Sequence, residues 1–183
     1  MIRKTAIVVS VLCTTVFAYA ATAFALETSP EPRIRSNLPV AALPATALGR
    51  DEALRVNNLL GELGPATGVT HQSYEQARRL SETAVGPLYL IPGTRGVCMT
   101  LAEGAGCGDP GAADRRVYAV VTLDSSGERL VGGGVAEASV RRVEMRVESS
   151  RIHALIPVSR GVFSIDVAVP GFKPDKGVTF VGR

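Results

Sequence analysis

The stretch that decides the fold reads VYAVVTL at residues 117–123, DSSG at residues 124–127 and RLV at residues 129–131. Its first segment is apolar on both faces of an extended chain, which is typical of a central strand. Asp, Ser and Gly then favour a turn, because Asp and Ser bond the local backbone and Gly accepts positive φ. The stretch therefore predicts two successive strands separated by a turn.

The same period of two continues on both sides of this stretch. Val143, Met145 and Val147 alternate with charged residues, which predicts a strand with one face in water. Further strands are predicted at residues 88–91, 97–101, 152–158, 163–169 and 178–181. About seven short strands, with a turn every 8–12 residues, are typical of a sandwich or barrel. The sequence thus predicts a mainly β fold, a small antiparallel β-sandwich or barrel.

One or two short helices are predicted before the strands. Apolar residues recur at helical spacing within residues 50–63, and a Gly-Pro pair ends that pattern. Ser73 and Gln76 form a capping-box pattern, which predicts a second helix over residues 74–82. Both helices would lie N-terminal to the β-sheet.

The N-terminal segment has the three-part form of an export signal. Arg3 and Lys4 precede an uncharged apolar run at residues 5–25, which ends in small residues. Ala23 and Ala25 supply the small-x-small pattern that signal peptidase recognises, so cleavage is predicted after Ala25.

Two alternatives stay open for this segment. Ala18 and Ala20 form a second cleavage pattern a few residues earlier. The apolar run at residues 5–25 is also long enough to span a bilayer as a helix, so residues 1–25 would otherwise be a retained membrane anchor. Because the two cations stay on the inner side, both interpretations place the rest of the chain outside the cytoplasm. The protein is therefore predicted to be secreted or associated with the cell envelope.

A proline-rich spacer is predicted at residues 26–49, before the mainly β domain at residues 50–183. Four prolines fall in it: Pro30, Pro32, Pro39 and Pro44. Proline removes amide donors and biases the preceding residue to extended conformations, which suits a spacer. Four apolar residues leave open that part of the spacer lies along the domain: Ile34, Leu38, Val40 and Leu43.

Charge and composition argue against two classes of partner. The chain has 20 basic and 17 acidic residues, and Arg3 and Lys4 belong to the N-terminal segment, so 18 basic and 17 acidic residues remain after it. This near balance predicts no nucleic-acid partner. Aromatic residues make up only 5% of the chain and Trp is absent, which argues against sugar binding by stacked rings.

Cys98 and Cys107 are the two cysteines outside the N-terminal segment. A disulfide is the default outside the cytoplasm, where thiols are oxidised. Gly104 and Gly106 lie between them and would reverse the chain by adopting positive φ. The spacing predicts a structural disulfide that stabilises the domain by about 2–3 kcal/mol.

The run LYLIPGTRGVC at residues 88–98, with ARR at residues 77–79 before it and Cys107 after it, carries a family resemblance. It resembles a group of uncharacterised exported proteins of high-GC Gram-positive bacteria, which typically show an apolar strand, Pro-Gly, Gly-Val-Cys and a second Cys. The resemblance extends over residues 78–180. The chain departs from the group at residues 132–140, where GGGVAEASV replaces a Pro-Asp-Gly-Val turn. The resemblance implies an exported, disulfide-bearing domain and brings no assigned activity.

Two histidines, His71 and His153, are the candidate catalytic bases. His153 is expected on a strand and His71 in a polar loop. No Gly-x-Ser-x-Gly nucleophile motif accompanies them, and two histidines are too few for a His-rich metal site. No metal and no cofactor are therefore predicted.

Two further patterns favour structural roles. The glycines at residues 132–134 lack the Lys-Ser/Thr of a phosphate loop and predict a place where another segment packs closely. Glu144 and Glu148 alternate with arginines, so they are predicted to form a salt-bridged, exposed strand face rather than a glycosidase pair.

The leading functional hypothesis is an exported, non-catalytic interaction module for an extracellular or envelope protein. It would contact the membrane only through residues 5–25, if these are not cleaved. One alternative is a small extracellular hydrolase that uses His71 or His153. Another is a secreted protease inhibitor that presents residues 92–107 as a preorganised loop.

Overall fold

A computed structural model describes residue 34 and residues 38–109, 116–148, 152–172 and 177–183, which all fall within one unit, residues 31–183. The predicted export signal and its cleavage site at Ala23 and Ala25 lie outside the described residues. A short 3-10 helix, η1 (Pro39–Ala42), comes first, and three α-helices follow: α2 (Arg50–Leu60), α3 (Leu63–Thr67) and α4 (His71–Glu75). In the part of the chain that is described, no helix is long and apolar enough to cross a membrane.

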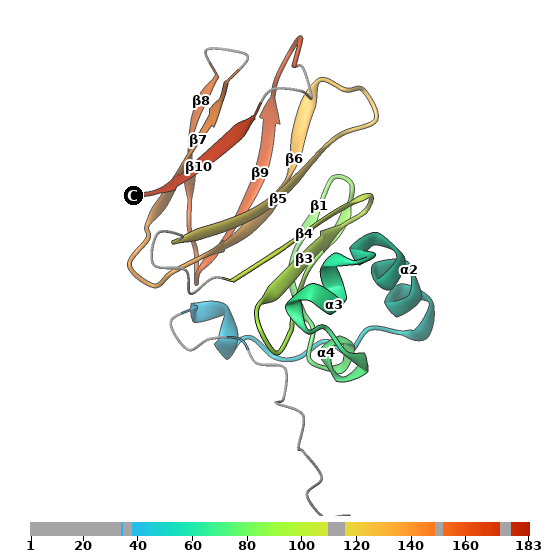
Figure 1. The fold of residues 1–183 in the computed structure, drawn as a ribbon. Helices are drawn as coiled ribbons and strands as arrows, with labels where there is room; N and C mark the ends of the chain where they lie inside the picture. The colour runs from blue at the N-terminus through green and yellow to red at the C-terminus, as the bar shows by residue number, and fades with distance from the viewer. Residues whose placement is uncertain (1–33, 35–37, 110–115, 149–151, 173–176) are drawn as a thin grey trace, which may run out of the picture. The chain divides into compact units, whose positions relative to one another are not determined.

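The strands form three antiparallel sheets (Figure 1). The first has the order β1-β2-β3-β4, the second β5-β6-β9 and the third β10-β7-β8. The bounds of the strands are β1 (Arg78–Thr83), β2 (Gly86–Pro92), β3 (Val97–Leu101), β4 (Gly104–Gly108), β5 (Val117–Leu123), β6 (Arg129–Ala136), β7 (Arg142–Val147), β8 (His153–Pro157), β9 (Val162–Ala168) and β10 (Val178–Gly182). The prediction of a mainly β, sandwich-like antiparallel fold is confirmed.

The four-stranded sheet is covered on both faces. On one face Leu88, Leu90 and Met99 join a core that also includes Val120 of β5. On the other face the side chains of β2 and β3 pack with those of α2, as Val56 and the residues around it show. Burial on both faces explains why Val97–Leu101 is apolar almost throughout, without the alternation of a half-exposed strand.

The glycine run at residues 132–134 lies within β6, the central strand of the second sheet. A Cβ on Gly133 would lie 2.9 Å from Cδ2 of Leu88, and one on Gly134 would lie 2.7 Å from Cζ of Phe163. Any side chain here would collide with its neighbours. The predicted close packing at this run is therefore confirmed.

The third sheet has one buried face and one exposed face. Val143, Met145 and Val147 of its central strand are buried in a core shared with Phe163 and Ile165 of β9. The charged residues between them point to the other side, as the alternation predicts.

The predicted helix over residues 74–82 is wrong. α4 ends at Glu75, and Arg78–Thr83 is β1, which pairs with β2 from Arg78 opposite Leu90 to Thr83 opposite Gly86. Pairing with a buried strand outweighs the helix propensity of these residues, because propensity is a weak preference that tertiary contacts override. His71 is consequently the first residue of a helix and not part of a loop.

The predicted glycine turn between the cysteines is also misplaced. The chain reverses at Ala102 and Glu103, and Gly104–Gly108 forms a full strand, β4. Neither Gly104 nor Gly106 has positive φ. Both glycines pair with β3 in the ladder, and Cys98 comes to lie directly opposite Cys107.

The end of the spacer packs on the domain. Leu38 and Val40 are buried in the same core as Leu88, and Ile34 and Leu43 pack against it. Proline at the start of η1 suits its position, because the first turn of a helix needs no amide donor there. Part of the spacer therefore lies along the domain, which is the alternative that its apolar residues allowed.

Candidate functional site: the outer face of the third sheet

The exposed face of the third sheet brings together side chains from three strands. β7 contributes Arg142, Glu144 and Arg146 to it. Directly opposite them on β8 lie Pro157, Leu155 and His153, and Val181 and Thr179 of β10 lie opposite Glu144 and Arg146. Arg183 follows β10 and pairs through its backbone with Arg142. The Glu144 face is the name used below for this set: Arg142, Glu144, Arg146, His153, Leu155, Pro157, Thr179, Val181 and Arg183.

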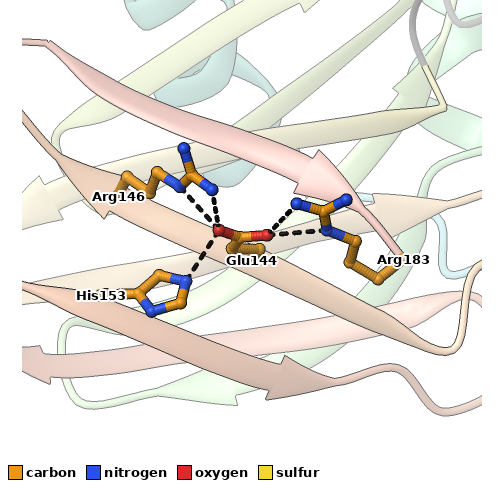
Figure 2. Close-up of polar contacts among 4 residues, drawn as sticks. All are labelled: Glu144, Arg146, His153 and Arg183. Atoms are coloured by element: carbon orange, nitrogen blue, oxygen red, sulfur yellow. Dashed lines mark hydrogen bonds and ion pairs between the residues drawn. The ribbon is translucent and has the colours of Figure 1, made fainter.

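Glu144 is the centre of the face, and its carboxylate is held from three sides (Figure 2). Nε of Arg146 donates to Oε1 over 2.6 Å, and Nε2 of His153 lies 2.8 Å from the same oxygen. Arg183 binds Oε2 with two nitrogens, Nε at 2.7 Å and Nη2 at 2.6 Å. Glu144 itself is only 4% exposed. A nearly buried carboxylate is thus saturated by charged and polar partners, as a buried charge requires.

These contacts keep Glu144 ionised. Hydrogen bonds from Arg183 and then from Arg146 lower the pKa of the Glu144 carboxyl to about 2, with a smaller contribution from His153, while burial opposes the shift. The carboxylate therefore carries its charge throughout the physiological pH range. With three partners it is a structural anchor and not a free general base.

The anchor holds cations on a surface that water still reaches. The side chains of Arg146 and Arg183 are 58% and 57% exposed although both bind Glu144. Arg142 is also exposed. Three arginines against one glutamate give the side chains of the face a net charge of +2 when histidine is counted as neutral.

Apolar side chains lie beside this charge. Leu155 is 55% exposed and Val181 is 41% exposed, and they stand opposite Glu144 on its two sides. The face therefore combines fixed guanidinium groups with apolar contact area. Arginine is enriched at protein–protein interfaces, and the buried core of such an interface is more apolar than the rest of the surface.

The structure separates the two candidate histidines. His71 is exposed on α4, with Nε2 4.0 Å from Oε1 of Glu75, whereas His153 is on β8 in the third sheet. His153 has the carboxylate partner that a catalytic histidine needs. Within the described ranges, however, no hydrogen bond joins either imidazole to a serine hydroxyl, and the carboxylate beside His153 is already bound by two arginines.

The predicted disulfide is confirmed. The sulfur atoms of Cys98 and Cys107 lie 2.08 Å apart, and their Cα atoms 4.0 Å apart, across β3 and β4. Cys98 is fully buried beneath the helices, where Oγ1 of Thr67 lies 3.1 Å from its sulfur. The segment at residues 92–107 is consequently two strands of a covered sheet, with Pro92 buried, and not one projecting loop.

The prediction for Glu144 was half right. It does form ion pairs, but it is buried, whereas Glu148 is exposed. The alternation of Arg142, Glu144 and Arg146 placed these residues on one face. His153 and Arg183 could not be added from the sequence, because strand pairing brings them there from 9 and 39 residues away.

Among the residues that the structure places, no three His, Cys, Asp or Glu side chains gather as a metal site. The fold and the face together define a mainly β domain with one disulfide and an open, positively charged sheet face. No protein-family model, curated protein or solved structure matches the chain. The resemblance of residues 78–180 to exported proteins of high-GC Gram-positive bacteria stays a prediction from the sequence.

Proposed function

We propose that the protein is an exported, non-catalytic interaction module that binds an extracellular or envelope protein through the Glu144 face. The single observation that carries the proposal is the saturated carboxylate of Glu144, which fixes Arg146 and Arg183 on an open sheet face. With a pKa of about 2, such a carboxylate is a weak proton acceptor. Its remaining role is to position the groups around it.

Positioned arginines favour binding. A free arginine loses rotamer freedom when a partner immobilises it, at a cost of about 0.5–1.5 kcal/mol for each side chain. Glu144 has already restricted Arg146 and Arg183, so less of that cost falls on the complex. Leu155 and Val181 add apolar area that a partner would remove from water.

The first experiment tests the face. Tagged full-length protein is expressed and exported, and partners are captured from the envelope fraction with wild type, Arg142→Glu and Leu155→Asp. The amount of one partner protein captured by wild type should fall about tenfold with either variant. Each variant places a carboxylate in the contact, which is either repelled by the partner or buried without a counter-charge.

Arg95→Glu is the matched control. It makes the same charge change at an exposed residue in the turn between β2 and β3, where the side chain of Arg95 donates to the carbonyl of Pro65. Capture should survive it. No recovered partner, or equal loss with Arg95→Glu, would contradict the proposal.

The second experiment tests export. The protein recovered outside the cytoplasm should have the mass of a chain that begins at Leu26 if the signal is cleaved. It should have the mass of a chain that includes residues 1–25 if these residues anchor it. Cys98 and Cys107 should resist thiol-blocking reagents in this material, since a disulfide is compatible with an extracellular location. Protein found only in the cytoplasm would contradict the exported location.

A further inference from the structure

β10 has an unpaired edge. In the described residues it pairs with β7 alone, and it ends the order of the third sheet. Arg183 exchanges backbone hydrogen bonds with Arg142, and the amide of Glu148 donates to Gly177. Because hydrogen-bonded pairs alternate in an antiparallel ladder, Val178, Phe180 and Gly182 direct their N–H and C=O groups away from β7.

A groove of about 610 Å³ lies along this edge. Residues 178–182 form one side of it. Residues 117–119 of β5 and Arg116, which precedes β5, form the other side. Val178 and Phe180 point their side chains toward the core beneath, as Val117 and Ala119 do from β5. The groove is therefore apolar at its base and has backbone donors and acceptors along the β10 side.

The two sides of the groove differ in access. β4 lies close to the β5 edge: a Cβ on Gly104 would lie 3.7 Å from Cγ2 of Val120 and 3.8 Å from the carbonyl oxygen of Val121. At the end of the groove β5 and β10 approach closely, since a Cβ on Gly182 would lie 3.0 Å from Cγ2 of Val117. β5 thus has β4 packed near it, whereas among the described strands none pairs with the outer side of β10.

We propose that β10 is a docking edge for an extended segment of a partner polypeptide in which apolar residues alternate with acidic ones. This inference rests on the proposed function, since it names how the partner would engage the same sheet. The added strand would bond the outward N–H and C=O groups of Val178, Phe180 and Gly182. Strand addition to a free sheet edge is a general mode of peptide recognition.

The alternation follows from the two faces of the sheet. Side chains of an added strand point alternately to its two sides. Those on the inner side would enter the apolar groove. Those on the outer side would extend the Glu144 face beside Val181 and Arg183, where the net charge of +2 favours carboxylates. Arg116, at the edge of the groove, is already paired with Glu137, so this preference comes from the Glu144 face alone.

A second copy of the chain fits the edge less well. β10 reads VTFVG and contains no acidic residue, so pairing between two β10 strands would bring two cationic faces together. Unpaired edges also invite such self-association in general. A second copy is therefore an outcome to be separated by the experiment.

The probe is a blocked peptide in which four valines alternate with three glutamates. Full-length protein labelled with ¹⁵N is titrated with it, and hydrogen exchange is followed at the amides of Val178, Phe180 and Gly182. These amides should exchange about tenfold more slowly at saturation, because pairing protects an amide from solvent. The same peptide with lysine in place of glutamate should bind about tenfold more weakly.

Val178→Pro is the matched variant. Proline removes the outward donor of Val178 without removing a hydrogen bond to β7, so the strand should persist while the peptide loses a contact. Unchanged protection of the Thr179 and Val181 amides would show that β10 is intact. Peptide affinity should then fall while the β10–β7 pairing stays.

Three outcomes would overturn the inference. They are acidic-peptide binding without protection of the β10 amides, equal binding of the lysine peptide, and protection that appears with protein concentration alone, which indicates a second copy. If envelope capture still depends on Arg142 in any of these cases, only the docking edge is wrong. If capture fails as well, the proposed function is wrong.

Discussion

The first and third sheets differ in how their central strands are buried. β3 in the first sheet is buried at every position from Val97 to Leu101, and a disulfide joins it to β4. β7 in the third sheet alternates between buried apolar residues and a charged outer face. Helices cover the second face of the first sheet, whereas the second face of the third sheet is open to water.

This difference assigns stability and recognition to different parts of the chain. Burying both faces removes more apolar area from water for each residue, which stabilises the fold. It also leaves little of the two central strands, β2 and β3, exposed to a partner. One face of the third sheet lacks that burial, and Glu144 there holds Arg146 and Arg183 in a fixed arrangement. Substitutions in the two sheets should therefore affect different measurements.

The largest effect is expected for Leu90→Ala in the first sheet. Leu90 is fully buried, so the substitution should lower the free energy of unfolding by about 2–5 kcal/mol through lost burial and a cavity. Leu155→Ala in the third sheet is the matched control and should change it by less than about 0.5 kcal/mol, since Leu155 is exposed. Denaturant unfolding measures both. Similar losses for the two would remove the contrast between the sheets.

The next effect concerns the disulfide. Cys98→Ala combined with Cys107→Ala should lower the free energy of unfolding by about 2–3 kcal/mol, since the short cross-link no longer restricts the unfolded chain. Alanine avoids an unpaired hydroxyl at the buried position of Cys98. The ¹H–¹⁵N signals of Arg146 and His153 should stay in place, because the disulfide lies in another sheet. Shifts there would mean that the two regions are coupled.

Much of this fold could be predicted because alternation and turn residues are local signals. Alternation predicts the strand at Arg142–Val147, and an apolar run before turn residues predicts the strand at Val117–Leu123. The disulfide follows instead from the predicted compartment and the two cysteines. The residues of β1 predict a helix because they form helices well, and only their pairing with β2 makes them extended. β4 was missed because three of its five residues are glycines, which normally indicate a turn.

The site was less accessible to prediction. Local alternation identified the arginines around Glu144 but placed the glutamate on an exposed surface. Its burial depends on His153 and Arg183 arriving from other strands, and register between distant strands has no local signal. The edge of β10 depends on the sheet order, which is also a property of the whole fold.

A smaller effect is expected from acid. The pKa of Glu144 is lowered to about 2 in the folded protein from an ordinary value of 4.5, so its contribution to stability is present above pH 4.5 and is lost as the pH falls toward 2. Glu144→Gln should remove this part of the pH dependence. Glu103→Gln, in the exposed turn between β3 and β4, should leave it unchanged. Urea unfolding measured from pH 6 to pH 2 decides between them, and identical curves for wild type and Glu144→Gln would contradict the assignment.

The smallest effect on stability, and the sharpest test of the third sheet, is expected for Arg183→Lys. Lysine keeps the charge but cannot bind Oε2 with two nitrogens as the guanidinium does, so the pKa of Glu144 should rise above about 2, and the free energy of unfolding above pH 4.5 should fall only by the small amount that this rise implies. Arg142→Lys is the control, because Arg142 lies on the same face without a hydrogen bond to Glu144 among the described contacts. A carboxyl-detected NMR titration of both variants reports this pKa directly. If Arg183→Lys leaves it at about 2, charge alone fixes the carboxylate, and the face owes its order to net charge and not to the geometry of one bidentate pair.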